Sequence, residues 1–133
     1  MSNDMDANIK LLYPVDKNSF FTIDDVGLGK EFDVIANVEV GEDLNEVINR
    51  HEVRVGIVNL TQSKAVGTPQ TLNQNVTPQN NTPLLAELRV AIPATWANDA
   101  EVGDVLQAVA SYKVIAGVNI DFSTAQSVTF VVS

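Results

Sequence analysis

The sequence predicts an all-β domain in which two sheets pack face to face. Three observations support this prediction: apolar and polar residues alternate over several short stretches, turn residues separate those stretches, and 45% of the 133 residues are hydrophobic. Alternation with a period of two is typical of a strand with one buried face. Such strands need a second layer to cover their apolar sides, which favours a sandwich or a barrel. The length matches a single domain, which we expect to span residues 1–133.

The alternation is clearest in four stretches, which are 31–40 (EFDVIANVEV), 51–60 (HEVRVGIVNL), 84–93 (LLAELRVAIP) and 127–133 (SVTFVVS). A shorter stretch at 9–15 (IKLLYPV) suits an edge strand, because its proline cannot donate to a ladder on both sides. We expect the following residues to be buried between the sheets: Val34, Val38, Val55, Ile57, Leu88, Val90, Tyr112 and Phe130.

Two stretches have helical features. Residues 43–49 carry apolar side chains at helical spacing, and Asp43 and Glu46 stand as in a capping box, so we expect a short helical turn there. Residues 104–116 fit both periods. As a helix they would begin at Asp104 and end at Gly117; as a strand they alternate throughout. We favour the strand, because an isolated helix among strands would need a layer of its own.

Two segments are expected to lie outside regular structure. The polar N-terminus, residues 1–8, is expected to be disordered. Residues 67–83 contain three prolines, many amide side chains and no charged residue. Because proline lacks a backbone donor and Asn favours turns, we expect a long, mobile crossover loop between the sheets. A short edge strand near 71–76 (TLNQNV) and a binding loop are the alternatives.

The order of these elements resembles that of immunoglobulin-like sandwiches. The succession of strands and crossover is similar to the A, B, C, crossover, E, F and G strands of that architecture, which implies about seven strands. The likeness is one of pattern only, because the chain has no Cys and its Trp96 follows residues 84–93 instead of lying in the third strand. A fold resemblance of this kind transfers no function.

Charge and composition argue against several functions. The 17 acidic and 8 basic residues give a net charge of −9, which repels phosphate backbones and anionic lipids. We therefore expect binding neither to nucleic acid nor to a membrane. No signal peptide is visible, and no stretch approaches the ~18 apolar residues of a membrane span. We expect a cytoplasmic protein unless the chain was cut from a larger secreted one.

Few residues suggest catalysis. The only histidine, His51, lies between the helical turn and a strand, where we expect it to be exposed to solvent. Carboxylate pairs at 24–25, 42–43 and 99–101 lie in hydrophilic stretches, where general acid–base chemistry is disfavoured. The absence of Cys removes thiolate chemistry. We expect no enzymatic activity and no cofactor.

One metal hypothesis arises from the acidic loops. In the immunoglobulin-like topology, the loops after the first and fifth strands lie at the same end of the sandwich. Their acidic residues are Asp24, Asp25, Asp99, Glu101 and Asp104. Calcium takes six to eight oxygen ligands, so carboxylates from two loops could form a site. No EF-hand spacing is present, and we favour the alternative of solvated acidic turns.

Three functions from different classes remain. The first is a structural or protein-interaction module, such as one domain of a larger surface or assembly protein, which an exposed edge strand and a long loop would favour. The second is a ligand- or carbohydrate-binding sandwich with Trp96 and Tyr13 as candidate platforms, although aromatic residues make up only 6% of the chain. The third is an enzyme. We expect the first, with a protein partner, and leave the oligomeric state open.

Overall fold

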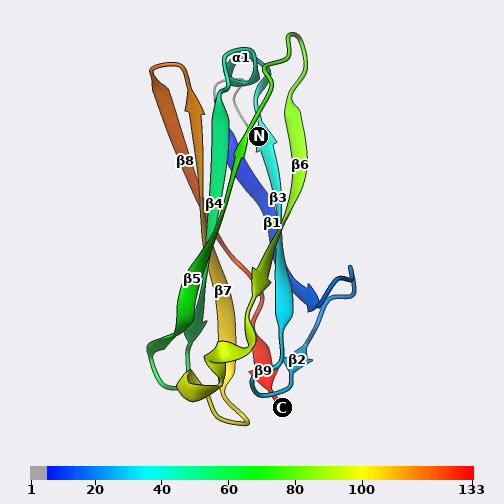
Figure 1. Ribbon diagram of the computed structural model, residues 1–133, viewed down its shortest axis with the longest axis vertical. Coiled ribbons are helices and arrows are strands. Elements are labelled where there is room, and N and C mark those ends of the chain that lie inside the picture. The colour runs from blue at the N-terminus through cyan, green and yellow to red at the C-terminus, as the bar shows by residue number, and fades with distance from the viewer. Residues whose placement is uncertain (1–5) are drawn as a thin grey trace.

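The computed structural model describes residues 6–133, which form an all-β, immunoglobulin-like sandwich of two sheets (Figure 1). The smaller sheet has the order β1-β3-β6 and contains β1 (Ala7–Asp16), β3 (Phe32–Val40) and β6 (Leu84–Ile92). The larger sheet has the order β2-β9-β7-β4-β5 and contains β2 (Asp25–Val26), β9 (Phe130–Val132), β7 (Val105–Ala116), β4 (Arg50–Asn59) and β5 (Lys64–Asn75). A further strand, β8 (Asn119–Gln126), pairs with β7. The predicted fold class is confirmed.

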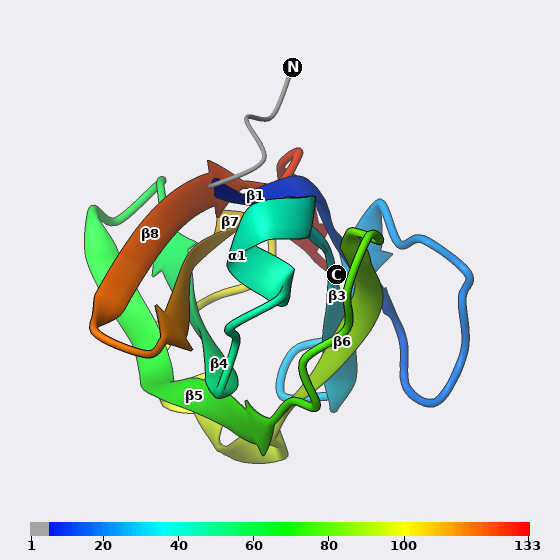
Figure 2. The same ribbon diagram turned by 90° about the horizontal axis from the view of Figure 1, so that it is seen from above.

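The core lies between the facing sides of the sheets (Figure 2). All eight predicted core residues are buried, with exposed fractions of at most 4%. Every second residue of β7 from Leu106 to Ala116 is buried, and the strand pairs with β4 and β8. Residues 105–116 therefore form the strand that we favoured, because in a helix alternate residues would not all face the core. Within residues 6–133, no helix is long and apolar enough to cross a membrane.

The predicted helical turn is present but shorter. The helix α1 (Glu42–Asn45) begins one residue early and makes a single turn. Its last residue, Asn45, is 1% exposed, and its Nδ2 donates to Thr82 O at 2.9 Å. The backbone N–H of Gln79 donates to Asn45 O at 3.3 Å. The turn therefore fastens the connection that follows β5.

The prediction of a loop at 67–83 is wrong for residues 67–75. Residues 67–75 belong to β5, which pairs antiparallel to β4 and forms the edge of the larger sheet. The register shifts between Val55 and Ile57, so the segment with Pro69 bulges out of the ladder. An edge strand pairs on one side only, and a bulge leaves an unpaired position, which is why proline is tolerated here. Only residues 76–83 form the crossover.

The predicted disorder of residues 1–8 is also wrong where it can be compared with the structure. Residues 1–5 lie outside the described residues. Ala7 and Asn8 belong to β1 and lie opposite Val40 and Glu39 of β3. The Ala7 N–H also donates to the Asp121 carboxylate at 2.7 Å. Pairing with β3 on one side and the hydrogen bond to the Asp121 side chain on the other hold this segment in place despite its polar sequence.

The structure contains more strands than predicted. Residues 6–133 form nine strands instead of about seven, because β2 and β8 lie outside every predicted strand and β5 was expected only as an alternative. Strands β8 and β9 pair in turn with the same edge of β7, and residues 127–129 connect them. Val128 lies in this connection and is 72% exposed, whereas Phe130 is 1% exposed, so the expected alternation begins only after the connection.

Candidate interaction site

The connection between β1 and β2 forms an ordered loop at the end of the small sheet. The Asp16 N–H donates to Phe21 O at 3.0 Å, and the Ser19 N–H donates to Asp16 O at 3.0 Å. The Ser19 hydroxyl donates to Asp16 O and accepts from the Phe21 N–H, at 2.9 and 3.1 Å. Asn18 has a φ of 60°, a left-handed conformation that Asn adopts more readily than most residues. We call residues 17–22 the Phe20–Phe21 loop.

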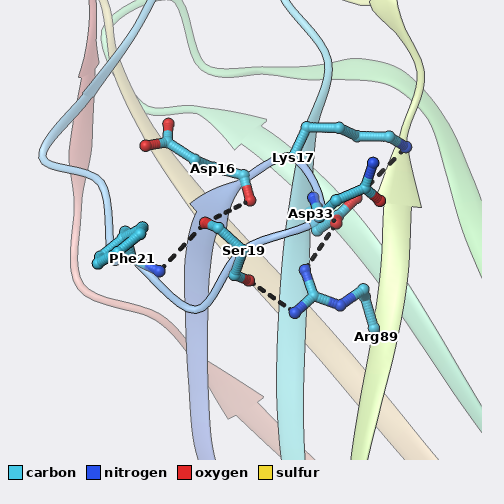
Figure 3. A network of polar contacts seen from close by, with 7 residues as sticks. Asp16, Lys17, Ser19, Phe21, Asp33 and Arg89 are labelled. Carbon is cyan, nitrogen blue, oxygen red and sulfur yellow. Dashed lines mark hydrogen bonds and ion pairs between the residues drawn. The ribbon is translucent and has the colours of Figure 1, made fainter.

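A buried carboxylate anchors this loop to the sheet (Figure 3). Asp33 of β3 is 1% exposed, and its Oδ2 accepts from the Asn18 N–H at 2.9 Å. The same oxygen accepts from Arg89 Nη1 of β6 at 2.7 Å, and Arg89 Nη2 donates to Ser19 O at 2.6 Å. Lys17 Nζ lies 3.5 Å from the other Asp33 oxygen. The Asp33 side chain thus joins the Phe20–Phe21 loop, β3 and β6.

The same contacts determine the charge of Asp33. Burial alone would raise the pKa of Asp33. The hydrogen bond from the Asn18 N–H, the hydrogen bond from Arg89 and the nearby positive charges outweigh burial. The pKa therefore lies below its usual value of 3.8, and the carboxylate is ionised at neutral pH.

The ordered loop holds two phenylalanines in water. Phe20 is 67% exposed and Phe21 is 76% exposed. The guanidinium carbon of Arg89 lies 4.9 Å from the centre of the Phe20 ring, close enough for a cation–π contact. Adjacent exposed aromatic side chains on a fixed backbone bind a partner with little loss of conformational entropy. This loop is the candidate interaction site.

Further apolar side chains lie on the outer face of the same sheet. The register of β3 with its neighbours places Leu11, Ile35 and Leu85 on that side. Ile35 is 1% exposed, but Leu11 is 59% exposed and Leu85 is 70% exposed. A shallow hollow of about 240 Å³ lies beside Leu85 and Asn37. The outer face is thus more apolar than the acidic composition of the chain suggests.

The five acidic residues of the metal hypothesis all lie at the end of the sandwich that holds β2, β9 and the start of β7 (Figure 1). Asp24, Asp25 and Glu101 are exposed, Asp99 is half-buried and Asp104 is buried. Among residues 6–133, no three His, Asp or Glu side chains come close enough to hold a metal ion. The topology thus brings these residues to one end without gathering them into a single group.

Two of these carboxylates bind protein donors. Asp104 Oδ2 accepts from Asn59 Nδ2 at 2.8 Å, from Gln62 Nε2 at 2.7 Å and from the Glu101 N–H at 2.9 Å. The hydrogen bond from Asn59, followed by that from the Glu101 N–H, lowers the pKa of Asp104. Asp99 Oδ2 accepts from the Gly67 N–H at 2.9 Å. Both carboxylates therefore stabilise the turns around β5 and β7.

His51 is not the exposed turn residue that we expected. It lies in β4, faces the core and is 3% exposed. Its Nδ1 lies 2.6 Å from the Tyr112 hydroxyl, and its Nε2 lies 3.0 Å from Gln74 Oε1. β4 begins at Arg50, one residue before the alternating stretch 51–60, so His51 lies within the strand and the alternation that buries Val53 also buries His51.

The predicted sugar platforms are poorly placed. Trp96 lies in the 3-10 helix η1 (Ala94–Asp99), is 1% exposed and donates its indole N–H to Lys30 O at 2.8 Å. It packs edge-on against Phe32 in the core, and Tyr13 is half-buried. A groove of about 770 Å³ lies instead on the outer face of the larger sheet, lined by Arg54, Gly56, Pro69, Val109, Ala110, Ser111, Thr124, Ala125 and Gln126.

Sequence reasoning identified neither the Phe20–Phe21 loop nor this groove. An aromatic pair within an otherwise polar stretch, "KNSFFTIDD" (17–25), was the available signal for the loop. For the groove there was none, because it depends on which small residues from β4, β7 and β8 lie side by side.

No protein-family model matches the chain, and the search of curated proteins found no match. Two solved structures resemble it in arrangement. A beta-glucuronidase from glycoside hydrolase family 2 shares 12% identity with a TM-score of 0.49, over 95% of this chain and 12% of that chain. A putative beta-galactosidase from Bacteroides fragilis shares 16% identity with a TM-score of 0.42, over 92% of this chain and 17% of that chain. The chain thus spans a small part of each, and the likeness carries no argument about its function.

Proposed function

We propose that the protein is a non-enzymatic interaction module that binds a protein partner through the Phe20–Phe21 loop. The observation that carries this proposal is the exposure of two adjacent phenylalanines, 67% and 76%, on a loop fixed by the Asp33–Arg89 contacts. Exposed apolar groups on an ordered surface are typical of protein–protein interaction sites. Lys17 and Asp16 beside them supply the polar rim that such sites usually have.

The test compares the unchanged chain with a Phe20→Ser/Phe21→Ser variant. A photo-reactive amino acid at position 11, on the same face, captures proteins in contact with the chain in its own cells. We expect the double variant to lose the captured partner while its melting temperature changes little, since both side chains are mostly in water. Val118→Ser is the matched control, because Val118 is 99% exposed and lies in the turn between β7 and β8. Capture that is unchanged in the double variant would contradict the proposal.

The groove on the larger sheet favours a second candidate function, the binding of a small acidic ligand. Cross-strand register aligns Arg54, Ser111 and Thr124 across β4, β7 and β8, which gives one cation and two hydroxyls in a row. The neighbouring row contains Gly56, whose missing side chain leaves room for a ligand. The groove has no aromatic lining residue, so it suits a carboxylate better than the face of a neutral sugar.

An array of acidic and neutral glycans, followed by calorimetry, tests this second candidate. We expect binding to be limited to carboxylate-bearing compounds and to be lost in Arg54→Gln, with Arg50→Gln on the same face of β4 as the control. Equal binding by both variants would exclude the groove as the site.

A further inference from the structure

The free edges of the sandwich are not equally protected. Strand β1 is covered on its outer edge: the Ala7 N–H donates to Asp121 Oδ2 at 2.7 Å, and the Ile9 N–H donates to Ser123 Oγ at 3.2 Å. Strand β5 is interrupted by the bulge at Pro69. Bulges, prolines and capping side chains are the usual means of preventing edge-to-edge pairing.

Strand β6 has neither a bulge nor an internal proline, and its two charged residues, Glu87 and Arg89, are opposite in sign. It pairs with β3 through nine successive residues without a register shift and forms the border of the small sheet. Prolines stand at positions 83 and 93, on either side of the strand and not within it. The partly buried Leu84 and Ala86 lie on the inner side of this edge, and Leu85 on the outer side is 70% exposed. A regular unpaired edge with incompletely covered apolar residues is a template for another strand.

We propose that β6 pairs antiparallel with β6 of a second copy of the chain, about a two-fold axis at Leu88. The sequence of β6, LLAELRVAI, is complementary to itself about that residue. Opposite residues would be Glu87 with Arg89, Ala86 with Val90, Leu85 with Ala91 and Leu84 with Ile92. Each pair joins opposite charges or two apolar side chains, the combinations that stabilise cross-strand neighbours. A two-fold interface requires this kind of self-complementarity.

The charges select one register. The inner face of one β6 must continue into the inner face of the other, so the two-fold axis must pass through a residue and not between two residues. Among the central residues, it can pass through position 87, 88 or 89. An axis at 87 would place Glu87 opposite Glu87, and an axis at 89 would place Arg89 opposite Arg89. Like charges directly opposite each other destabilise a strand pair. Only the axis at Leu88 places each Glu87 beside an Arg89.

Arg89 can take part in this pairing without leaving Asp33. Within the chain, its Nη1 donates to Asp33, its Nη2 donates to Ser19 O and its guanidinium lies over the Phe20 ring, and its side chain remains 31% exposed. A guanidinium group has five N–H donors, so donors remain for Glu87 of the second copy. Glu87 itself is exposed.

Sedimentation velocity over a concentration series, up to the solubility limit and at physiological ionic strength, tests the association. The chain should shift from monomer to dimer as its concentration rises. Glu87→Arg should abolish the dimer, because each copy would then present a second cation to Arg89. Glu101→Arg, the same charge change at an exposed position in the turn before β7, should leave the dimer unchanged. A monomer at every concentration, or a dimer that persists in Glu87→Arg, would overturn the proposal.

Cysteine cross-linking tests the register, since the chain has no native Cys. In the proposed dimer, positions 85 and 91 of opposite copies face each other about 4.5–5.5 Å apart between Cβ atoms, close to disulfide geometry. A mixture of Leu85→Cys and Ala91→Cys should therefore form a mixed cross-linked dimer. Leu85→Cys alone should not, because its two cysteines would lie about 20 Å apart along the strands. Efficient cross-linking of Leu85→Cys with itself, or none in the mixture, would contradict the axis at Leu88.

Discussion

Asp33 shows how one buried carboxylate can order an exposed loop. Its Oδ2 accepts hydrogen bonds from the Asn18 N–H and from Arg89, and Lys17 Nζ lies 3.5 Å from its Oδ1, so the energy of three contacts depends on one ionised group. A buried carboxylate without such donors would be protonated or absent. The hydrogen bonds of Asp33 thus fix the backbone that carries Phe20 and Phe21.

We expect Asp33→Asn to lower the free energy of unfolding by about 1–3 kcal/mol at pH 7, because Arg89 and the Asn18 N–H lose an ionised acceptor. The folded-state pKa of Asp33 lies below 3.8, so its stabilisation is complete above that pH and is lost as the pH falls through 3.8 to the folded-state value. The difference in unfolding free energy between Asp33→Asn and the unchanged chain should therefore become smaller below about pH 4. Urea unfolding at a series of pH values measures this. Asp16→Asn, which alters an exposed carboxylate at the end of β1, is the control and should change stability by less than about 0.5 kcal/mol.

His51 and Tyr112 form a second buried polar pair. Burial raises the pKa of Tyr112, so its hydroxyl keeps its proton and donates to His51 Nδ1. Gln74 Oε1 is an acceptor, so His51 carries its hydrogen on Nε2. Either Tyr112→Phe or His51→Leu alone leaves one group unpaired and should cost about 1–3 kcal/mol. A double-mutant cycle measured by urea unfolding tests this. The loss of unfolding free energy in the double variant should be smaller than the sum of the losses in the two single variants; equal values would show that the pair is not coupled.

At the scale of elements, strand alternation was read correctly wherever one face of a strand is fully buried. β3, β4 and β7 meet this condition and were all predicted; β6 was also predicted, although Leu84 and Ala86 on its inner face are only partly buried. β8 has no buried residue, and its Ile120 and Phe122 point to solvent, so its alternation does not distinguish inside from outside. β5 carries proline in a bulge that only pairing with β4 reveals. These strands depend on contacts between distant residues, which local periodicity does not contain.

Amide exchange rates should differ between the two halves of the segment 67–83. Amides of β5 that pair with β4 should be protected, whereas residues 77–82 other than Gln79 should exchange quickly, and this segment should be cut first by a non-specific protease. Asn45→Ala should speed cleavage there, because it removes the Nδ2 hydrogen bond to Thr82 O. Glu46→Ala, which alters the exposed residue next to Asn45, is the control. Equal exchange rates across 67–83 would contradict the division.

On the scale of the whole molecule, the two outer faces have different characters. The small sheet presents the Phe20–Phe21 loop and the open edge of β6, and the larger sheet presents a groove with Arg54. The candidate sites could not be predicted from the sequence, because the identity of an apolar residue does not determine whether its side chain is buried or exposed. The exposure of Phe20 and the burial of Trp96 are both set by tertiary contacts, the former by the Asp33–Arg89 anchor and the latter by Phe32 and Lys30 O.

The acidic end of the molecule permits a last prediction, about calcium. Asp99 and Asp104 already accept hydrogen bonds from protein donors, and Asp24 and Asp25 are exposed on another element. Calcium would have to displace these donors, so we expect it to act only by screening repulsion between carboxylates. Calcium and sodium at matched ionic strength should then shift the melting temperature equally. A specific site would instead add about 2.7 kcal/mol at a 100-fold excess over its dissociation constant. A calcium shift that persists in high sodium and disappears in Asp25→Asn/Asp99→Asn would show that the five acidic residues do form a site.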